Sequence, residues 1–310
     1  MTYRYRGAVP RTLRGLVALV CSAAALGVWS LPAGAGEADV DAFRGLGTWV
    51  DVYDYVPGFQ TEGGPPPVTV DSIDDMAALG VRTLYLQASQ DDDRLDGPTV
   101  PRELLGRFLR RAHEHDLDVV AWYLPQFDDV RGDLRRIRAL ADFRTEGERF
   151  DGIALDVEYT QALPDPVARS DALVKLASRA REVVDDRPLG AIVLEPLLLE
   201  EVNRDYWPGF PWRKIRRDFD VWLPMSYWTN RDEASGYRDG FAYTEENIRR
   251  VRKRVGDDAV VHAIGGIADT ATTGDYLGFV NAADRRDAIG YSIYDFNTTT
   301  SGVWARLRDR

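Results

Sequence analysis

Eight short runs of apolar and β-branched residues recur along this chain of 310 residues, and their spacing is the feature that most constrains its fold. Successive runs begin 29 to 39 residues apart, and most intervening segments carry apolar residues at the three- and four-residue spacing of amphipathic helices. Strands that alternate with helices favour a parallel sheet, so eight such units predict an α/β fold, a single (β/α)8 TIM barrel. The predicted strands are Gly47–Tyr53, Val81–Gln87, Asp118–Leu124, Gly152–Glu158, Leu189–Glu195, Asp220–Ser226, Ala259–Gly265 and Ala288–Tyr294.

Helices are predicted in most of the segments between these strands. Two long connections, at 58–67 and 206–212, follow the C-terminal ends of predicted strands, where a barrel builds its working face. Thr244 has the side chain of an N-cap for the helix after it. The predicted helices are Ser72–Leu79, Pro101–His115, Val130–Glu146, Pro166–Val184, Glu245–Val255, Asp275–Arg286 and Ser301–Arg308.

Residues 1–35 have the pattern of a secretory signal peptide. A start with four arginines precedes the apolar run Gly15–Leu31, and small residues follow at 33–35. The run is short for a membrane span and contains serines and glycines, so a membrane anchor is the less favoured alternative. We expect a cleaved Sec-type signal over 1–35, a short lead-in over 36–46 and the barrel domain over 47–310.

The charge and the cysteine content narrow the class of protein further. The single cysteine, Cys21, lies in the expected signal, so the mature chain would fold without a disulfide. Residues 1–35 contain no acid, and loss of their four arginines would change the formal net charge from −11 to −15. Such acidity argues against nucleic acid and against stable membrane association. It predicts a secreted, extracellular protein with a neutral or cationic ligand.

The fourth predicted strand, within FDGIALDVEY at 150–159, carries the strongest chemical signal. Because side chains alternate along a strand, Ala154, Asp156 and Glu158 share the face opposite to the apolar one. Two carboxylates on a barrel's inner face are costly to bury unless they are paired or used, and they would lie near its C-terminal mouth. The alternative is a structural acid pair at the rim.

These residues resemble the strand-four signature DxxDxDxE of family 18 glycoside hydrolases, the chitinases and their relatives. Asp151, Asp156 and Glu158 match three of its four acids, and Ala154 replaces the remaining one. Met225 and Tyr227 resemble that family's Met-x-Tyr strand. The chain departs from the family at three places. Trp228 follows the tyrosine, residues 119–126 lack Ser-x-Gly-Gly, and Tyr294 stands where the family usually has tryptophan. The segment LDVEYT is also similar to the Asp-x-Glu strand of family 25 muramidases.

The resemblance implies a polysaccharide substrate that contains N-acetylated amino sugars. Glu158 would protonate the glycosidic oxygen, and Asp156 would orient the substrate's own N-acetyl group, whose carbonyl oxygen attacks the anomeric carbon. Tyr227 would donate a hydrogen bond to that carbonyl. The loss of the inner acid at Ala154 leaves turnover open, so a carbohydrate-binding barrel without catalysis is the alternative. A barrel enzyme that acts on something other than sugar is a third hypothesis.

Further acids and aromatic residues end the other strands. Asp51, Asp54, Glu195 and Asp295 are candidate partners of Glu158, although a rim salt bridge is the ordinary role of such an acid. Sugar rings stack on aromatic side chains. We therefore expect the substrate to be contacted by a set of residues at the strand ends: Trp228, Trp122, Tyr294, Glu195, Asp295, Asp51 and Met225.

The sequence predicts neither a metal site nor a cofactor. His113 and His115 lie two residues apart near a helix end and face different directions, and His262 stands alone in its strand. No dinucleotide-binding glycine motif, phosphate-binding loop or Gly-x-Ser-x-Gly elbow is present.

Overall fold

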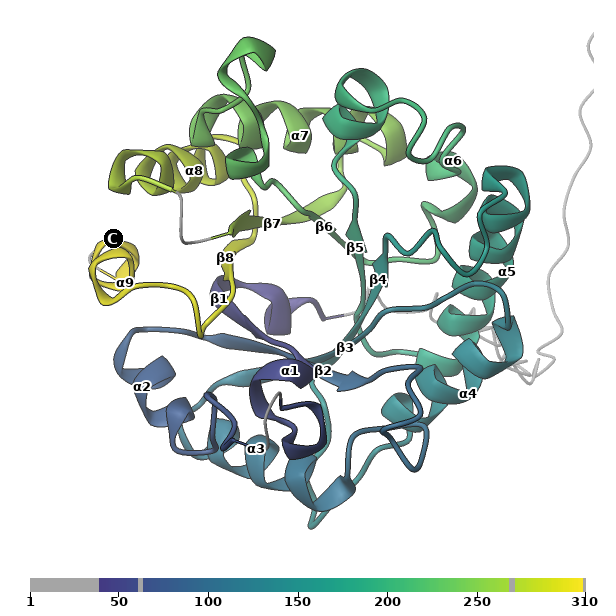
Figure 1. Cartoon of the computed structure of the whole chain (residues 1–310), viewed down its shortest axis with the longest axis vertical. Helices are drawn as coiled ribbons and strands as arrows, with labels where there is room; N and C mark the ends of the chain where they lie inside the picture. Colours follow the sequence, from purple (N-terminus) through teal and green to yellow (C-terminus); the bar gives the residue numbers. More distant parts are fainter. Residues whose placement is uncertain (1–38, 61–63, 268–270, 309–310) are drawn as a thin grey trace, which may run out of the picture. The chain divides into compact units, whose positions relative to one another are not determined.

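The computed structural model describes residues 39–60, 64–267 and 271–308, so the predicted signal peptide lies outside the described residues. Eight parallel strands pair in chain order, and β8 pairs with β1 to close a barrel (Figure 1). The prediction of a single (β/α)8 barrel is therefore confirmed. The strands are β1 (Gly45–Val50), β2 (Thr83–Ser89), β3 (Asp118–Tyr123), β4 (Gly152–Val157), β5 (Leu189–Val193), β6 (Val221–Pro224), β7 (Val260–Gly266) and β8 (Gly290–Tyr294).

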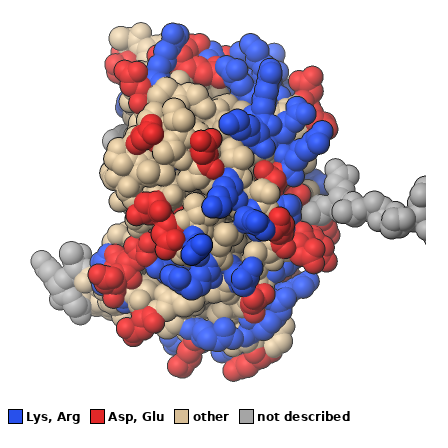
Figure 2. Space-filling view, turned by 90° about the vertical axis from the view of Figure 1, so that its right-hand side faces the viewer, with Lys and Arg blue, Asp and Glu red and all other residues tan. Residues whose placement is uncertain are grey.

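The helices surround the barrel as an outer ring (Figure 1). Within the described residues, none of them has the length and apolar character that a membrane crossing requires. Figure 2 shows the side of the molecule on which α4, α5 and α6 lie in Figure 1; basic and acidic side chains are interspersed over it. The helices are α1 (Val52–Tyr55), α2 (Ser72–Ala78), α3 (Arg102–Glu114), α4 (Val130–Ala141), α5 (Pro166–Val184), α6 (Trp212–Ile215), α7 (Gly240–Val255), α8 (Thr273–Arg285) and α9 (Ser301–Arg308).

Two of the predicted helix boundaries were wrong. Helix α7 begins five residues before the predicted start, because the Asp239 side chain accepts a hydrogen bond from the Ala242 N–H at 2.7 Å and caps the helix. The predicted cap, Thr244, is a buried residue inside the helix. Helix α4 ends at Ala141 instead of Glu146.

The first strand ends earlier than predicted because an aspartate begins a helix there. Asp51 caps α1, its Oδ1 accepting a hydrogen bond from the Tyr53 N–H at 2.7 Å. Asp54 completes a capping box with the Asp51 backbone. The turn places Asp51 at the C-terminal end of the barrel, and the chain leaves the barrel there as α1.

The segment before β1 closes the opposite end of the barrel. Residues Asp41–Phe43 form a 3-10 turn, and the Phe43 side chain is fully buried. Glycine is required opposite its ring, since a Cβ atom on Gly152 or Gly190 would lie 2.9 Å from it. The Phe43 carbonyl oxygen also lies 2.8 Å from His262 Nδ1 inside the barrel. The lead-in predicted over 36–46 thus includes a buried plug and the first residues of β1.

Aromatic side chains fill the barrel above this plug. Trp49 stacks on Tyr85 with ring centroids 4.2 Å apart and meets the edge of Trp122 at 6.0 Å. The Trp49 indole N–H donates to Ser292 Oγ at 2.8 Å, which satisfies its buried polar atom. These rings form the floor beneath the C-terminal mouth of the barrel.

Candidate functional site

A cavity of about 550 Å³ opens at the C-terminal ends of the strands. Its floor is formed by the aromatic layer, and its wall by strand ends and by the loop between β2 and α3. This is the end at which barrel enzymes build their active sites. The lining residues are Trp49, Asp51, Tyr53, Gln87, Gln90, Asp91, Asp92, Trp122, Leu124, Gln126, Asp156, Glu158, Tyr159, Ile192, Met225, Tyr227, Ile264, Ile267 and Tyr294.

Asp156 and Glu158 enter this cavity together from the end of β4. Burial raises the pKa of Asp156 well above its usual value, and the neighbouring Glu158 charge raises it further. Burial likewise raises the pKa of Glu158. Each shift favours the neutral acid, because a charged carboxylate is poorly solvated here. The pair can therefore hold a proton at a pH where an exposed carboxyl group would have lost it.

Two buried polar atoms of the lining residues have no partner in the described structure. Asp156 Oδ1 accepts no hydrogen bond, although the residue is only 8 % exposed. The Trp122 indole N–H likewise makes no hydrogen bond. Buried polar groups are normally satisfied by protein, water or ligand. Both atoms are closed off from solvent, so the cavity lining holds one unsatisfied acceptor and one unsatisfied donor.

Three further residues taken from the family resemblance also reach the cavity. Met225, Tyr227 and Tyr294 all line it, and the rings of the two tyrosines lie 6.1 Å apart. Burial raises the pKa of the Tyr227 phenol well above its usual value, so this group is a hydrogen-bond donor at any ordinary pH. Asp151 is placed elsewhere: its Oδ2 accepts a hydrogen bond from the Val119 N–H at 2.7 Å, before β4 begins.

Three aspartates form a cluster beside the cavity. One carboxylate oxygen from each of Asp51, Asp54 and Asp295 lies within 4.8 Å of the others. Asp51 Oδ2 accepts the Tyr294 hydroxyl at 2.9 Å. Burial and the two neighbouring charges raise the pKa of Asp54 to about 7. Only Asp51 of the three lines the cavity, so the predicted contact between Asp295 and substrate is corrected to a position behind it.

The donor set of this cluster is of the kind that holds a hard cation, since calcium and magnesium take carboxylate oxygens. Each carboxylate is already used within the protein, however. Asn297 Nδ2 donates to Asp54 at 3.1 Å, and the Thr298 N–H donates to Asp295 at 2.8 Å. These hydrogen bonds tie the turn after β1 to the residues at and after the end of β8.

Glu195 does not line the cavity, which corrects the prediction that it contacts substrate. Its carboxylate is 3 % exposed and accepts the Tyr243 hydroxyl at 2.6 Å, and Arg231 lies 4.0 Å away. Burial raises the pKa of Glu195 to about 7, although the Tyr243 hydrogen bond and the Arg231 charge oppose the shift. The residue belongs to a buried polar contact between β5, α7 and the turn after β6.

Trp228 was also misplaced by the sequence reasoning. The residue is 1 % exposed, and its ring packs 5.5 Å from that of Tyr276 and 5.4 Å from that of Phe279, both on α8. The backbone turns at Tyr227, so the next side chain points outward under the helices. Trp122 does line the cavity, as predicted.

The two long connections that were expected to form the working face do not line the cavity in the described residues. Residues 58–60, 64–67 and 206–212 contribute nothing to the lining. Trp207 instead packs against Phe127 at 5.7 Å, with the Arg169 guanidinium 4.2 Å above its ring. Gln90, Asp91 and Asp92, which follow β2, form part of the wall and were missed. The polar run QDDD, which directly follows a predicted strand, is the sequence feature that could have indicated them.

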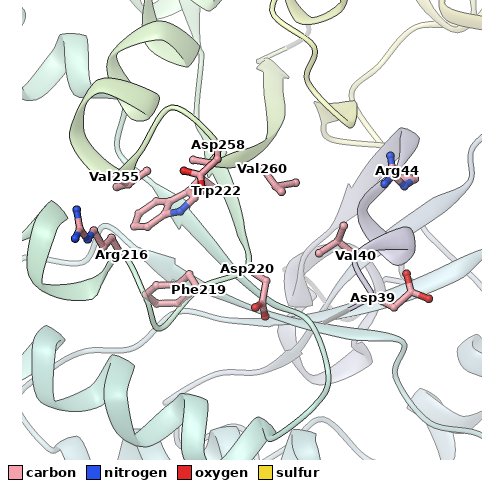
Figure 3. Close-up of a pocket in the computed structure, with 11 residues that line it drawn as sticks. Asp39, Val40, Arg44, Arg216, Phe219, Asp220, Trp222, Val255, Asp258 and Val260 are labelled. Atoms are coloured by element: carbon pink, nitrogen blue, oxygen red, sulfur yellow. The ribbon is translucent and has the colours of Figure 1, made fainter. Parts of the chain in front are cut away.

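A second cavity of about 550 Å³ lies at the opposite end of the barrel, near the starts of β6 and β7 (Figure 3). Its apolar lining includes Trp222, Phe219, Val260 and Val40. The acid Asp220 in this cavity is bound by Arg181 at 2.5 Å and accepts the Leu189 N–H at 2.8 Å. That carboxylate therefore has a structural role, and the C-terminal cavity is the candidate site.

Comparisons with known proteins agree on the fold. No family model matches the chain, and no curated protein matches it in sequence. Among solved structures, a class V chitinase from Pseudomonas fluorescens Pf-5 aligns with a TM-score of 0.59 and 12% identity, over 85% of this chain and 98% of that chain. The PgaB (BpsB) glycoside hydrolase domain from Bordetella bronchiseptica aligns with a TM-score of 0.58 and 15% identity, over 86% and 98%.

A third similar structure is a glycoside hydrolase family 18 N-acetylglucosaminidase from Paenibacillus barengoltzii, with a TM-score of 0.56 and 12% identity over 86% of this chain and 99% of that chain. The structural neighbours thus include family 18 enzymes and other glycoside hydrolases built on the same barrel. At these identities the likeness shows a shared (β/α)8 fold, and the chemistry must be argued from the site itself.

Proposed function

We propose that this protein is a secreted glycoside hydrolase that acts on a polysaccharide containing N-acetylated amino sugars, with Glu158 as the general acid. The observation that carries the proposal is the joint entry of Asp156 and Glu158 into an aromatic-walled cavity, where burial raises both pKa values. A cavity of about 550 Å³ falls within the range of small-ligand sites. The likeness to glycoside hydrolases of the same fold supports this choice.

In the proposed reaction, Glu158 donates its proton to the glycosidic oxygen as the bond to the anomeric carbon breaks. The carbonyl oxygen of the substrate's N-acetyl group forms the new bond to that carbon. Water then attacks the same carbon, gives its proton to the Glu158 carboxylate and breaks the bond to the acetamido oxygen, which restores the acid for the next turnover. The Asp156 side chain accepts the N–H of the acetamido group, and the Tyr227 hydroxyl donates to the acetamido carbonyl. Burial raises the pKa of Glu158, which favours the protonated form that a general acid needs.

A second candidate function is carbohydrate binding without turnover. The observation that favours it is Ala154, which stands where the resembling enzymes carry an inner acid. Without that acid, Asp156 has lost a neighbour with which a proton and charge could be shared. The cavity would then serve as a lectin-like pocket, with Trp49, Trp122 and Tyr294 as stacking surfaces.

One assay separates the two functions. The mature chain is incubated with chitin, peptidoglycan and other amino-sugar polymers, and new reducing ends are measured together with retention on the same polymers. The proposed enzyme releases reducing ends from at least one of them. Retention without release, abolished by Trp122→Ala, would establish the binding protein instead.

A further inference from the structure

Arg169, near the start of α5, is a buried arginine without a carboxylate partner. Its side chain is 2 % exposed, and its guanidinium forms no ion pair with an acid of the described residues. Arginine stays charged in proteins, and a buried charge is costly unless polar groups of the protein replace its water. The guanidinium must therefore be compensated by other polar groups around it.

Backbone carbonyl groups of two loops supply this compensation. Arg169 Nη1 donates to the Leu163 carbonyl at 2.7 Å and to the Pro164 carbonyl at 3.1 Å, both in the loop between β4 and α5. Its Nη2 donates to the Tyr206 carbonyl at 3.3 Å, in the connection between β5 and α6. One side chain thus ties the segment after β4 to the segment after β5.

Trp207 holds the same side chain from another direction. The centroid of its ring lies 4.2 Å from the guanidinium carbon of Arg169, and Trp207 is itself buried. The indole N–H donates to Ser170 Oγ at 3.0 Å, which fixes the ring against α5. A cation over an indole face is stabilised most when both are shielded from water. The guanidinium is therefore fixed in orientation as well as in position.

The two loops that Arg169 joins flank the proposed general acid. The pairing of β4 with β5 ends at Val157, so Glu158 is the first residue beyond the paired strand. Glu158 and Tyr159, which begin the first loop, both line the cavity. Burial raises the pKa of the Tyr206 phenol and the Glu158 charge raises it further, so the second loop also lies near the acid.

We propose that Arg169 is a positioning residue: it holds the loop after Glu158 against the connection after β5, and so fixes the Glu158 carboxyl group in the cavity. The inference rests on the proposed function, since it assigns a residue that acts through the general acid. Arginine suits this role, because its planar fork of five N–H donors reaches carbonyls of two loops at once. A displacement of about 1 Å at a reacting group can slow a reaction about a hundredfold, so such a contact can control the rate.

The test compares Arg169→Lys with Arg181→Lys, a matched control on the same helix. The Arg181 guanidinium, near the other end of α5, donates to two backbone carbonyls and pairs with Asp220 at the opposite end of the barrel. Lysine keeps the charge and the apolar stem but has no planar fork, so it cannot bridge two loops. Both substitutions disrupt a network of carbonyl contacts, and only one of these networks holds the loop after Glu158.

Steady-state kinetics on an N-acetylglucosamine hexamer give the first readout. We expect Arg169→Lys to lower kcat about 10–100-fold and to leave KM within about threefold, because a displaced acid weakens the transition state and not the bound substrate. Arg181→Lys should lower the thermal transition and keep the kcat of the parent. A parental kcat in Arg169→Lys, or equal losses of kcat in both variants, would overturn the inference.

The second readout follows Glu158 itself and needs no turnover. Burial raises the pKa of Glu158, so a looser loop that admits water should let that pKa fall toward the value of an exposed glutamate. Because lysine keeps the positive charge, such a fall reports movement of the loop and not a lost charge. NMR titration of protein with 13C-labelled glutamate carboxyl groups measures it, with Glu158→Gln to assign the signal. We expect a lower pKa in Arg169→Lys and the parental value in Arg181→Lys; a parental value in both would count against the role.

A second variant covers the case in which Arg169→Lys loses its thermal transition. Trp207→Phe leaves the arginine in the chain and replaces the indole ring beneath it by a smaller one that attracts a cation less strongly. We expect kcat to fall about threefold with KM unchanged. An unchanged kcat in this variant would overturn the inference.

Failure of this inference differs from failure of the proposed function. Hydrolysis by the parent, with Arg169→Lys equally active, would uphold the enzyme and overturn the inference. A parent that hydrolyses no amino-sugar polymer, together with a lower Glu158 pKa in Arg169→Lys alone, would uphold the positioning of Glu158 and contradict the enzyme.

Discussion

Trp122 on β3 lies opposite Ala154 on β4 in the parallel register of the barrel, so both side chains point inward. The position at which the resembling enzymes carry an acid is therefore occupied by a methyl group beneath an indole ring. Ala154 is fully buried, and Trp122 is 5 % exposed. At this level of the barrel, Trp122 lines the cavity and Ala154 contributes no charge.

Ala154→Asp should therefore destabilise the protein and should not add activity. The new carboxylate would be buried against the indole without a basic partner, a cost on the order of 3 kcal/mol. Urea unfolding of the variant beside Ala154→Ser, which adds one small polar atom, measures the difference. A stable Ala154→Asp protein with raised turnover would show that the interior can accept the acid.

Trp122 and Trp228 should respond differently to the same substitution. Trp122→Leu removes a wall of the cavity, so we expect KM for saccharides to rise about tenfold. Trp228→Leu removes a core ring between Tyr276 and Phe279, so we expect a loss of about 2–4 kcal/mol in unfolding free energy and an unchanged KM. Steady-state kinetics and thermal unfolding of both variants check this pair. An increase in KM for Trp228→Leu alone would contradict the placement.

The fold could be predicted from the sequence because each parallel strand is a continuous apolar run, and the alternation with helices leaves few topologies. The site could be predicted only in part. Period-two alternation placed Asp156 and Glu158 on the inner face. The same alternation puts Met225 and Tyr227 in the cavity and Trp228 on the outer face, so the prediction of Trp228 as a cavity wall, made from its aromatic character at a strand end, was wrong. Glu195 looks like a site acid in sequence, and only the partner residue Tyr243 on α7, 48 positions away, reveals its buried role.

His262 should make stability depend on acid pH. Burial lowers the pKa of this histidine from 6.5 to about 4, so the unfolded chain binds its proton more readily. Its neutral form stabilises the fold above pH 6.5, and this contribution, on the order of 3 kcal/mol, is lost as the pH falls toward 4. Unfolding free energy measured across that range should fall less steeply for His262→Gln.

Tyr227→Phe should slow the reaction more than it weakens binding. The hydroxyl is proposed to hold the acetamido carbonyl as it attacks, so its loss removes a hydrogen bond that strengthens in the transition state. We expect kcat to fall about 10–100-fold with little change in KM, on an N-acetylated substrate. Tyr237→Phe, at a partly buried tyrosine outside the cavity, is the matched control. Equal effects of the two substitutions on kcat would contradict the proposed role of the Tyr227 hydroxyl in the reaction.

The most direct test of the account measures reducing-end release by Glu158→Gln beside Glu103→Gln, an exposed glutamate on α3. Both variants should keep the thermal transition of the parent. The account predicts that Glu158→Gln loses at least about a thousandfold in kcat and still binds substrate, while Glu103→Gln retains full activity. Hydrolysis by Glu158→Gln at the rate of the parent would contradict the assignment of the proton donor.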